Sequence, residues 1–526
     1  MKTTVLYALL LCSLACCIHA GPDEWTITGK PSPGHEVKLT FAIKQHNPDW
    51  LKDKLKAVSY PDSPHYTDYM NFDEIAQYVY GEPESVKVVT EALESMGASK
   101  IDFTIGRDFV VALVPFENVE QYFNTQLLEF ESTTDGSKIV TSFHHVVPVS
   151  LKEHVDFLSG LTLLESGTNY KERKPQQGAP KTGVSVTPKS IDKDYNISGY
   201  TSSNANNSQA IAAFLKQYFD ASDLQTFQKR FDIPAKPIAK IVGKDRPTNP
   251  GIEANLDVQY ISATGRNVDT WFISVSTYSN NKQEDFLSWI VSQVNTTSSP
   301  WVHSASYGDD ESSIATDYLT RVDAEFMKFG ISGRTVLLAT GDSGVECNGA
   351  QMFTPNWPTS SPYITAVGGT ISLDTVWSSG GGGFSNYFGM PDYQKDAVKA
   401  YLDSGKGPSV SHFNVSGRAY PDVSAFAVNF EVIEYGQAIP VGGTSCAAPT
   451  VAGIISILND VRLNKGQKTL GFLNPLLYMT LKGNGFFDIV NGNNGNGVCR
   501  GFEAVKGWDP ASGWGSPNFG LLKGLV

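Results

Sequence analysis

Hydrophobic and polar residues alternate in two different ways along the chain, and the change falls near residue 168. Before that point, strands of period two and helices of period near four follow one another closely. The predicted strands are 36–43, 101–104, 109–115 and 138–143, and the predicted helices are 49–58, 72–80, 85–96 and 119–127. This mixture predicts a small α+β unit of ferredoxin-like type, preceding a larger domain. The alternative is that the segment is only the first half of that domain.

A polar segment, TNYKERKPQQGAPKTGVSVTPK at 168–189, separates the two patterns. It is rich in Lys, Pro, Gly and Gln and has almost no large apolar side chain, which predicts an exposed linker that proteases cut easily. We therefore expect a signal peptide at 1–20, a prodomain at 21–167, the cleavable linker at 168–189 and a second domain at 190–526. This is the layout of a zymogen.

Beyond the linker, strands and helices alternate regularly. The predicted helices are 210–231, 251–260, 285–293 and 314–329, and the predicted strands are 238–242, 271–276, 301–306, 335–340 and 363–367. Such alternation predicts an α/β fold, a mostly parallel sheet with helices on both faces. In these sheets the chemistry gathers at the carboxyl ends of the strands, and Asp342 directly follows the strand TVLLAT.

Composition narrows the choice of partners and compartment. The chain has 526 residues with 41% hydrophobic and 18% charged residues, as in globular proteins, and a net charge of −13. No basic cluster is dense enough to bind phosphates, so we expect no nucleic-acid partner. Residues 1–20 have the form of a cleaved secretory signal. No long apolar segment follows, so we expect no membrane span and a protein of the secretory pathway.

Cysteines and sequons fit that compartment. Cys12, Cys16 and Cys17 lie in the signal segment, and Cys347, Cys446 and Cys499 remain. An oxidising lumen favours one disulfide, which we assign to Cys347 and Cys499 because Cys446 stands among small residues and supplies packing volume. Four Asn-X-Ser/Thr sequons are glycosylation candidates: Asn196, Asn206, Asn295 and Asn414.

The stretch VGGTSCAAP at 441–449 precedes an apolar helix pattern at 451–458. Small residues around Ser445 would let a substrate carbonyl approach its hydroxyl, and the start of a helix favours developing negative charge. Ser445 is therefore a candidate nucleophile. The same letters are also typical of an ordinary helix N-cap, so the interpretation depends on finding a base.

Histidine is the usual base, but only His303 and His412 lie beyond the linker, one in a predicted strand and one in a Ser-rich loop. Carboxylates are better placed. Glu253 and Asp257 in GIEANLDVQY are four residues apart on a predicted helix and share one of its faces. The alternative for this pair is a solvated acidic face without a function. Apolar neighbours on the same helix favour a buried pair instead.

Several motifs in this order resemble the sedolisins, the serine-carboxyl peptidases, and within them the lysosomal tripeptidyl-peptidase branch. They are GIEANLDVQY, SYGDDE, TGDSG, TAVGGT, YPDVSA, GGTSCAAP and GWDPASGWGSPN. The segment containing LTFAIKQHN and SPHY resembles the prodomain of that family. The likeness covers nearly the whole chain after the signal segment. It implies a subtilisin-like catalytic domain. Cys446 and Ala447 depart from the Ala-Ser often found there, which affects packing more than mechanism.

The resemblance implies that Ser445 is the nucleophile, Glu253 the general base and acid, Asp257 the residue that orients Glu253, and Asp342 the oxyanion donor. Elementary acid–base chemistry agrees. At a pH of about 4.5 only about 1% of free histidine is neutral, whereas a carboxylate can still accept a proton. Asp342 can donate only when protonated. An ionised base and a protonated donor coexist only in a window around pH 4 to 5.

Two further sites are expected. Asp309, in SYGDDE, is a candidate for the acid network or for binding the substrate amino terminus, with a surface acidic cluster as the alternative. The C-terminal loop is rich in Gly and Asn, and oxygen ligands in such loops suit a hard cation. The resemblance implies one calcium ion, with ligands from Asp488, Ile489, Val505, Gly507 and Asp509.

The leading hypothesis is an acid-activated peptidase that releases tripeptides from free N-termini and is inhibited by its own prodomain. We expect a monomer that acts on peptides in the lysosome, with secretion as the alternative destination. Three other hypotheses remain open: an acid endopeptidase of the same family, a catalytically silent secreted glycoprotein, and a subtilisin-type triad that uses a histidine. The position of the base relative to Ser445 distinguishes the last of these from the first.

Overall fold

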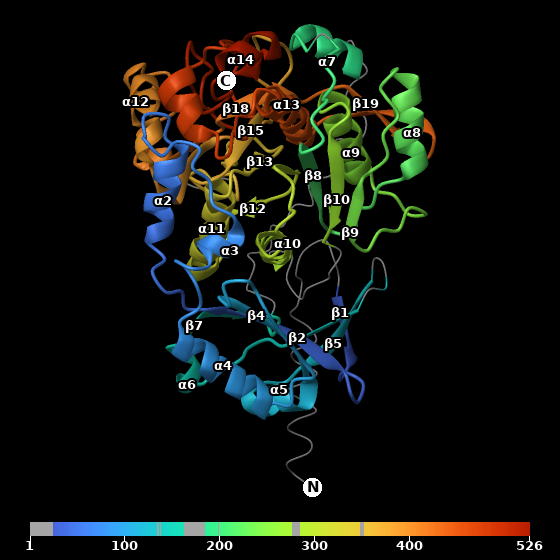
Figure 1. The fold of residues 1–526 in the computed structure, drawn as a ribbon, viewed down its shortest axis with the longest axis vertical. Coiled ribbons are helices and arrows are strands. Elements are labelled where there is room, and N and C mark those ends of the chain that lie inside the picture. Colours follow the sequence, from blue (N-terminus) through green and yellow to red (C-terminus); the bar gives the residue numbers. More distant parts are fainter. Residues whose placement is uncertain are drawn as a thin grey trace.

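The protein is described by a computed structural model. It describes residues 25–133, 136, 138–162, 185–197, 199–275, 284–347 and 352–526. The predicted signal peptide and residues 168–184 of the predicted linker lie outside these ranges. A smaller N-terminal region, blue to teal in Figure 1, lies at one end of the molecule, and the larger region with a parallel sheet occupies the other end.

The N-terminal region is built on a four-stranded antiparallel sheet in the order β3-β4-β2-β7. Its elements follow the sequence β2 (Glu36–Ile43), α4 (Pro83–Ser95), β3 (Lys100–Phe103), β4 (Phe109–Pro115), α5 (Phe116–Tyr122) and β7 (Val155–Ser159). This is the ferredoxin-like βαββαβ topology that the sequence predicts. Alternate residues of β2, from Val37 to Ile43, pack against α4 and α5 and form the core of this region.

Smaller elements complete this region. A second sheet joins β1 (Trp25–Gly29), β5 (Leu128–Ser132) and β6 (Lys138–Thr141), and α6 (Val149–Lys152) precedes β7. Helices α2 (Trp50–Ser59) and α3 (Phe72–Ile75) bury Leu51, Leu55 and Phe72 in the core of the larger region instead of their own. Helix α3 is shorter than the predicted helix 72–80. The segment between β2 and α4 therefore ties the two regions together.

The larger region contains a seven-stranded sheet whose neighbouring strands are all parallel, in the order β18-β15-β13-β11-β8-β10-β9. Its strands are β8 (Ser208–Ala213), β9 (Lys240–Gly243), β10 (Asp269–Ser274), β11 (Val302–Ala305), β13 (Thr335–Ala339), β15 (Thr365–Thr370) and β18 (Val423–Phe426). Every residue of β11, β13, β15 and β18 is buried, as expected for a parallel sheet covered on both faces.

Helices pack on this sheet and on one another (Figure 1). Helix α13 (Thr444–Asn464) runs along the sheet against five strands, and α9 (Ile252–Thr264) packs on α13. Helix α11 (Thr316–Ile331) lies between β13 and α2, with α10 (Glu284–Val294) beside it. The remaining α-helices among the described residues of this region are α7 (Pro188–Asp194), α8 (Ala221–Arg230), α12 (Lys395–Asp403) and α14 (Phe519–Leu525).

Among the described residues of this region, four two-stranded antiparallel sheets lie outside the seven-stranded sheet. They are β12 (Asp309–Asp310) with β14 (Asn356–Trp357), β16 (Gly383–Gly389) with β17 (Gly417–Tyr420), β19 (Phe430–Glu434) with β20 (Gln437–Val441), and β21 (Phe486–Phe487) with β22 (Ser516–Pro517). Residues 185–189 of the predicted linker belong to the larger region: Val186 forms a bridge with Phe430, and Thr187 caps α7.

The prediction of one helix over residues 210–231 is wrong. Residues Ser208–Ala213 form β8, near the middle of the sheet, and only Ala221–Arg230 is helical. Alanine favours helices, and a buried parallel strand shows no alternation, so the run QAIAAF reads as helical in isolation. Five of the six residues of β8 are buried, and the strand pairs along its two edges with β10 and β11, which decides the outcome.

Within the described ranges, α13 is the one helix whose length and composition would suffice to cross a membrane. However, 83% of its apolar window is buried inside the structure. Its apolar character is explained by this central position, where it packs on both the sheet and α9.

Candidate active site

Ser445 lies in the first turn of α13, which begins at Thr444 after Gly443. Gly443 has φ +146°, a conformation that residues with a side chain rarely adopt, and a Cβ atom there would lie 2.8 Å from Asp342 Oδ2. Glycine is therefore needed for the turn and for the approach of Asp342. Ser445 is 1% exposed and stands at the positive end of the helix dipole.

Glu253 and Asp257 project from the first turns of α9 and are 2% and 0% exposed. The two helices approach closely because residue 453 on α13 is glycine: a Cβ there would lie 2.0 Å from Thr264 Oγ1 on α9. The predicted buried pair is present, and the alternative of a solvated acidic face is wrong.

Burial is the main cause of the pKa shifts of this pair, and no cation is among the causes. Desolvation raises the pKa of Glu253 well above its usual range, as do the Asp257 and Asp342 carboxyls, while the hydroxyls of Ser445 and Ser306 lower it. Desolvation likewise raises the pKa of Asp257. Within the described residues neither Glu253 oxygen makes a hydrogen bond of normal geometry, so the Ser445 hydroxyl is near the carboxylate but not tightly bound to it. The pair therefore retains protons to higher pH than free carboxyls.

Asp342 follows β13 and is half-buried. Its Oδ1 accepts hydrogen bonds from the Thr444 backbone N–H at 2.8 Å and from the Thr444 hydroxyl at 2.9 Å. Since Asp342 also influences Glu253, the structure brings together all four residues named as catalytic from the sequence.

Ser306 is a site residue to which the sequence analysis assigned no role. It follows the last residue of β11, is fully buried, and donates a hydrogen bond from Oγ to Asp257 Oδ1 at 2.8 Å. Its position at the carboxyl end of a central strand was the available signal.

Neither histidine serves as a base for Ser445. His303 is buried in β11, its Nε2 contacts the Pro300 carbonyl and Ser299 Oγ at 3.0 and 3.2 Å, and its Nδ1 has no hydrogen bond among the described residues. Burial lowers the pKa of His303 to about 3. The ring of His412 stacks on Phe353, with ring centres 5.5 Å apart. In the described part of the chain both rings thus contact residues other than Ser445, which argues against a subtilisin-type triad.

Asp309 is buried in β12, where its Oδ1 accepts a hydrogen bond from the Asp310 N–H at 2.8 Å. A surface acidic cluster is the wrong description of this buried residue, and its role as a substrate ligand stays a prediction.

The C-terminal loop brings the two predicted calcium carboxylates to one turn. Gly507 N–H donates to both oxygens of Asp488, and Val505 N–H donates to Asp509 Oδ2 at 2.9 Å. Burial raises the pKa of Asp509 to about 7. The described residues contain no cluster of three or more His, Cys, Asp or Glu side chains suited to a metal, so a cation here would need backbone carbonyls as well.

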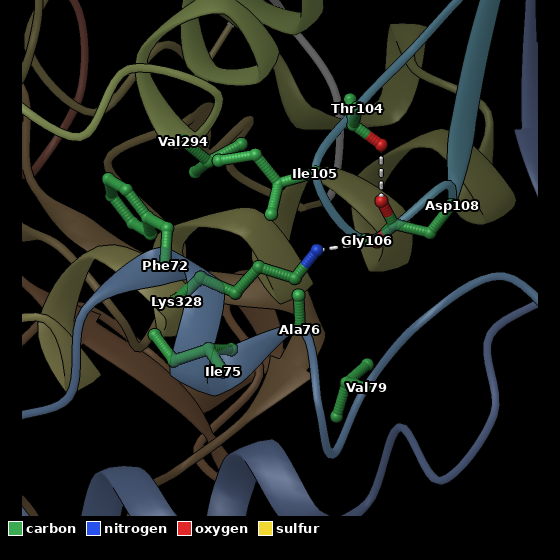
Figure 2. Close-up of a pocket in the computed structure, with 10 residues that line it drawn as sticks. All are labelled: Phe72, Ile75, Ala76, Val79, Thr104, Ile105, Gly106, Asp108, Val294 and Lys328. Carbon is green, nitrogen blue, oxygen red and sulfur yellow. Dashed lines mark hydrogen bonds and ion pairs between the residues drawn. The ribbon is translucent and has the colours of Figure 1, made fainter.

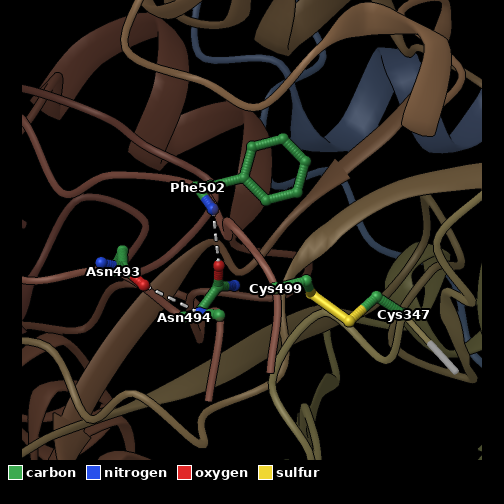
Figure 3. The surroundings of a disulfide bond; sticks show 6 residues. Cys347, Asn493, Asn494, Cys499 and Phe502 are labelled. Carbon is green, nitrogen blue, oxygen red and sulfur yellow. Dashed lines mark hydrogen bonds between the residues drawn. A yellow bond between two sulfur atoms is a disulfide. The ribbon is translucent and has the colours of Figure 1, made fainter. Parts of the chain in front are cut away.

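Cys347 and Cys499 form the predicted disulfide, which links the loop after Asp342 to the C-terminal loop (Figure 3). Beside it, Asn494 Oδ1 accepts from Phe502 N–H at 2.9 Å and the Asn494 carbonyl accepts from Val345 N–H at 3.0 Å. Cys446 is free and buried. The pKa of its thiol is raised by burial and by the carboxyls of the site, so it is an inert packing residue.

The four sequon asparagines differ in their surroundings. The amides of Asn196 and Asn414 donate hydrogen bonds to Asn518 Oδ1 and the Ser385 carbonyl, both at 3.1 Å. Asn206 is exposed, and Asn295 Oδ1 accepts from Ile105 N–H of the N-terminal region at 2.7 Å.

A buried ion cluster joins the two regions beside a cavity of about 20 Å³ (Figure 2). Asp108, in the turn between β3 and β4, is 1% exposed. It accepts from Lys328 Nζ at 2.5 Å and from Arg321 Nη2 at 3.2 Å, both on one face of α11. Glu325, between them on α11, accepts from both cations. Desolvation would raise the pKa of Asp108, but the two cations outweigh it and hold this pKa far below its usual range.

Comparison with known proteins agrees with the fold and the site. The family described as "Pro-kumamolisin, activation domain" matches residues 23–164. Tripeptidyl-peptidase 1 of Homo sapiens is 38% identical over 559 residues, which covers 99% of this chain and 98% of that protein. The Mus musculus protein of the same name is 38% identical over 535 residues, covering 96% and 94% of the two chains.

The solved structure of Pseudomonas sedolisin, a serine-carboxyl proteinase, covers 65% of this chain and 98% of that one, with 24% identity and a TM-score of 0.53. Its likeness supports the subtilisin-like arrangement of the larger region. Together the fold and the site define a sedolisin-type serine peptidase made as a zymogen. The chain belongs to the tripeptidyl-peptidase 1 family.

Proposed function

We propose that this protein removes tripeptides from the free N-termini of peptides at acid pH, with Ser445 as the nucleophile and Glu253 as its base. The observation that carries the proposal is the Ser445 hydroxyl beside a buried carboxylate pair, while the described ring contacts of His303 and His412 are with other residues. The full-length likeness to tripeptidyl-peptidase 1 proteins supports the choice of substrate.

In the first step, Ser445 Oγ attacks the carbonyl carbon of the scissile peptide bond while Glu253 accepts the hydroxyl proton. Asp257, held by Ser306, orients Glu253. A proton on Asp257 removes one negative charge from the pair, so Glu253 can ionise without a second charge beside it.

The developing oxyanion accepts a hydrogen bond from protonated Asp342. Collapse of the tetrahedral intermediate breaks the C–N bond, and Glu253 returns its proton to the leaving amine. Water then repeats the sequence on the acyl-enzyme, and Glu253 again acts first as base and then as acid.

The raised pKa of Glu253 moves the acid limb of activity upward from that of a free glutamate. Activity should fall again at higher pH as Asp342 loses its proton. Both limbs belong to the coupled carboxyls together. We therefore expect an optimum in weakly acid solution and little activity at neutral pH.

The N-terminal region acts in this proposal as an intramolecular inhibitor, residues 21–167, released by cleavage within 168–189. The match of residues 23–164 to an activation domain and the buried contact through Asp108 support this role. The mature enzyme is expected as a monomer in the lysosome, the destination that the family resemblance implies.

Calcium fits the C-terminal loop. Asp509 is fully buried with no basic group among the causes of its raised pKa, so a cation would neutralise the charge it gains on ionising. Asp488, Asp509 and the carbonyls of Ile489, Val505 and Gly507 would hold the ion, which would supply structural charge to this loop. Calcium should then raise the unfolding temperature, and an Asp488→Asn variant should lose that response.

The decisive experiment incubates the purified precursor at about pH 4.5, sequences the new N-terminus, and assays matched peptides with free and acetylated N-termini. Tripeptide release confined to free N-termini supports the proposal. Equal cleavage of blocked peptides would identify an endopeptidase of the same family instead. No cleavage by the processed enzyme would revive the catalytically silent glycoprotein.

A further inference from the structure

The Thr444 hydroxyl lies between two groups of the loop that follows β13, and it is completely buried. Gly341 N–H donates to Thr444 Oγ1 at 3.0 Å, and Thr444 Oγ1 lies 2.9 Å from Asp342 Oδ1. The Thr444 backbone N–H donates to the same oxygen at 2.8 Å. Thr444 thus contacts the candidate oxyanion donor twice while it precedes the candidate nucleophile in the chain.

The directions of these hydrogen bonds are determined by chemistry. A backbone N–H can only donate, so Thr444 Oγ1 accepts from Gly341. A threonine hydroxyl has a single proton, and that proton is left for Asp342 Oδ1. Oδ1 therefore receives two donors, one from the hydroxyl and one from the Thr444 backbone.

A carboxylic acid has one hydroxyl oxygen and one carbonyl oxygen. The oxygen that already accepts two hydrogen bonds is the carbonyl oxygen, so the acidic proton belongs on Oδ2. Oδ2 faces Gly443. A Cβ atom at that residue would lie 2.8 Å from Oδ2, so the glycine leaves room for this oxygen. The alternative protonation, on Oδ1, would place an O–H against two other donors.

We propose that Thr444 is a positioning residue that keeps the proton of Asp342 on Oδ2, the oxygen that donates to the oxyanion. This inference rests on the proposed role of Asp342 and goes beyond it by naming the donor oxygen and the group that selects it. Glu253 on α9 and Cys446 on α13 are titratable groups that interact electrostatically with Asp342, whereas Thr444 makes the two hydrogen bonds to its Oδ1.

The test compares Thr444→Val, which has nearly the same shape without the hydroxyl, with Thr444→Ser, which keeps it. Thr450→Val is the matched control, because Thr450 is also buried on α13 and its hydroxyl donates to the Cys446 carbonyl at 2.7 Å. Each precursor is matured by tagged wild-type enzyme, which is then removed. Steady-state kinetics with a free N-terminal peptide are measured from pH 3.5 to 7.

We expect Thr444→Val to lower kcat about 10- to 100-fold with KM changed less than about twofold, since only the transition state contains the oxyanion. Thr444→Ser should stay within about threefold of wild type, and so should Thr450→Val. The alkaline limb should move to higher pH in Thr444→Val, because the variant loses a hydrogen bond that favours ionised Asp342. If Thr444→Val does not mature, Thr444→Ala replaces it in the same comparison.

A double-mutant cycle separates this inference from the function on which it rests. In an Asp342→Ala background, Thr444→Val should have little further effect on the residual rate. An equal loss in both backgrounds, or wild-type kinetics for Thr444→Val while Ser445→Ala is inactive, would overturn the inference alone. Full turnover by Ser445→Ala would instead overturn the proposed function.

Discussion

Two buried acidic sites in this molecule have opposite electrostatics. Asp108 and the Glu253–Asp257 pair are equally removed from water. Asp108 faces Lys328 and Arg321, and its pKa falls far below the usual range. Glu253 and Asp257 face each other, hydroxyls and Asp342, and their pKa values rise. Burial alone therefore does not set the charge of a carboxyl; the nearest cation does.

This difference in pKa matches the different roles that we assign to the two sites, structural for Asp108 and chemical for the Glu253–Asp257 pair. Lys328 and Arg321 favour the ionised form of Asp108, which suits a stable ion cluster between the two regions of the precursor. The raised pKa values of Glu253 and Asp257 favour their protonated forms, which suits a proposed base that must later act as an acid.

The largest effect is expected from substitutions at Ser445 and Glu253, in the site whose pKa values are raised. Ser445→Ala should reduce turnover by about 10⁴-fold or more and stop self-processing, and Glu253→Gln should do nearly the same because glutamine accepts no proton. Both are measured with a free N-terminal peptide at about pH 4.5. Asp396→Asn, an exposed carboxyl of the same region, is the control and should be unchanged. Normal turnover by Glu253→Gln would show that the pair is not the base.

The next largest effect is expected at Asp108, in the buried ion cluster. Asp108→Asn, placed in the inactive Ser445→Ala precursor to prevent processing, should lower the free energy of unfolding by about 3–5 kcal/mol, because Lys328 and Arg321 lose a buried counter-charge. Urea denaturation gives the value.

Lys56→Met is the matched control for that experiment. Lys56 pairs with Asp392 between the same two regions at 3.6 Å, but both side chains are largely exposed. Its loss should cost less than about 1 kcal/mol. Equal effects of the two substitutions would mean that burial of Asp108 contributes nothing to the contact.

A smaller effect is expected in the pH dependence of stability. The raised pKa values of Glu253 and Asp257 mean that their contribution is complete below their ordinary values of 4.5 and 3.8 and is lost as pH rises through the folded values. Asp108 has the opposite sign: its contribution is present above 3.8 and is lost only in stronger acid.

Unfolding temperatures of the Ser445→Ala precursor at pH 4.5 and 7 test this difference. Adding Glu253→Gln should reduce the loss of stability between the two pH values, whereas adding Asp108→Asn should lower both temperatures by similar amounts. The reverse pattern would contradict the assignment of raised and lowered pKa values.

The smallest effect is expected at a neutral contact between the same regions. Asn295→Gln misplaces the oxygen that accepts from Ile105 N–H and should destabilise the precursor by about 0.5–1.5 kcal/mol. Asn206→Gln removes a sequon without such a contact and is the control. Protein produced without glycosylation separates the hydrogen bond from any glycan, and identical unfolding midpoints would show that the contact is dispensable.

Sequence patterns succeeded where local rules dominate. Strand β2 alternates clearly between polar and apolar residues, and the predicted bounds of β2 and β4 are confirmed. Ser445 and the Glu253–Asp257 pair became candidates because short motifs place them at the start of a helix and on one helix face, and the structure confirms these positions. Strand β8 was mistaken for a helix because its burial on both faces removes the alternation that identifies a strand.

The sequence by itself determined the two-region layout, the sedolisin likeness, the candidate catalytic residues and the two cysteines of the disulfide. Only the tertiary structure decided the pKa shifts of the acidic groups and their hydrogen-bond partners. Asp108 meets Lys328 from 220 residues away, Ser306 reaches Asp257 across 49 residues, and Thr444 reaches Asp342 across 102. A pKa depends on burial and on neighbours within a few ångströms, and folding brings those neighbours together from distant parts of the chain.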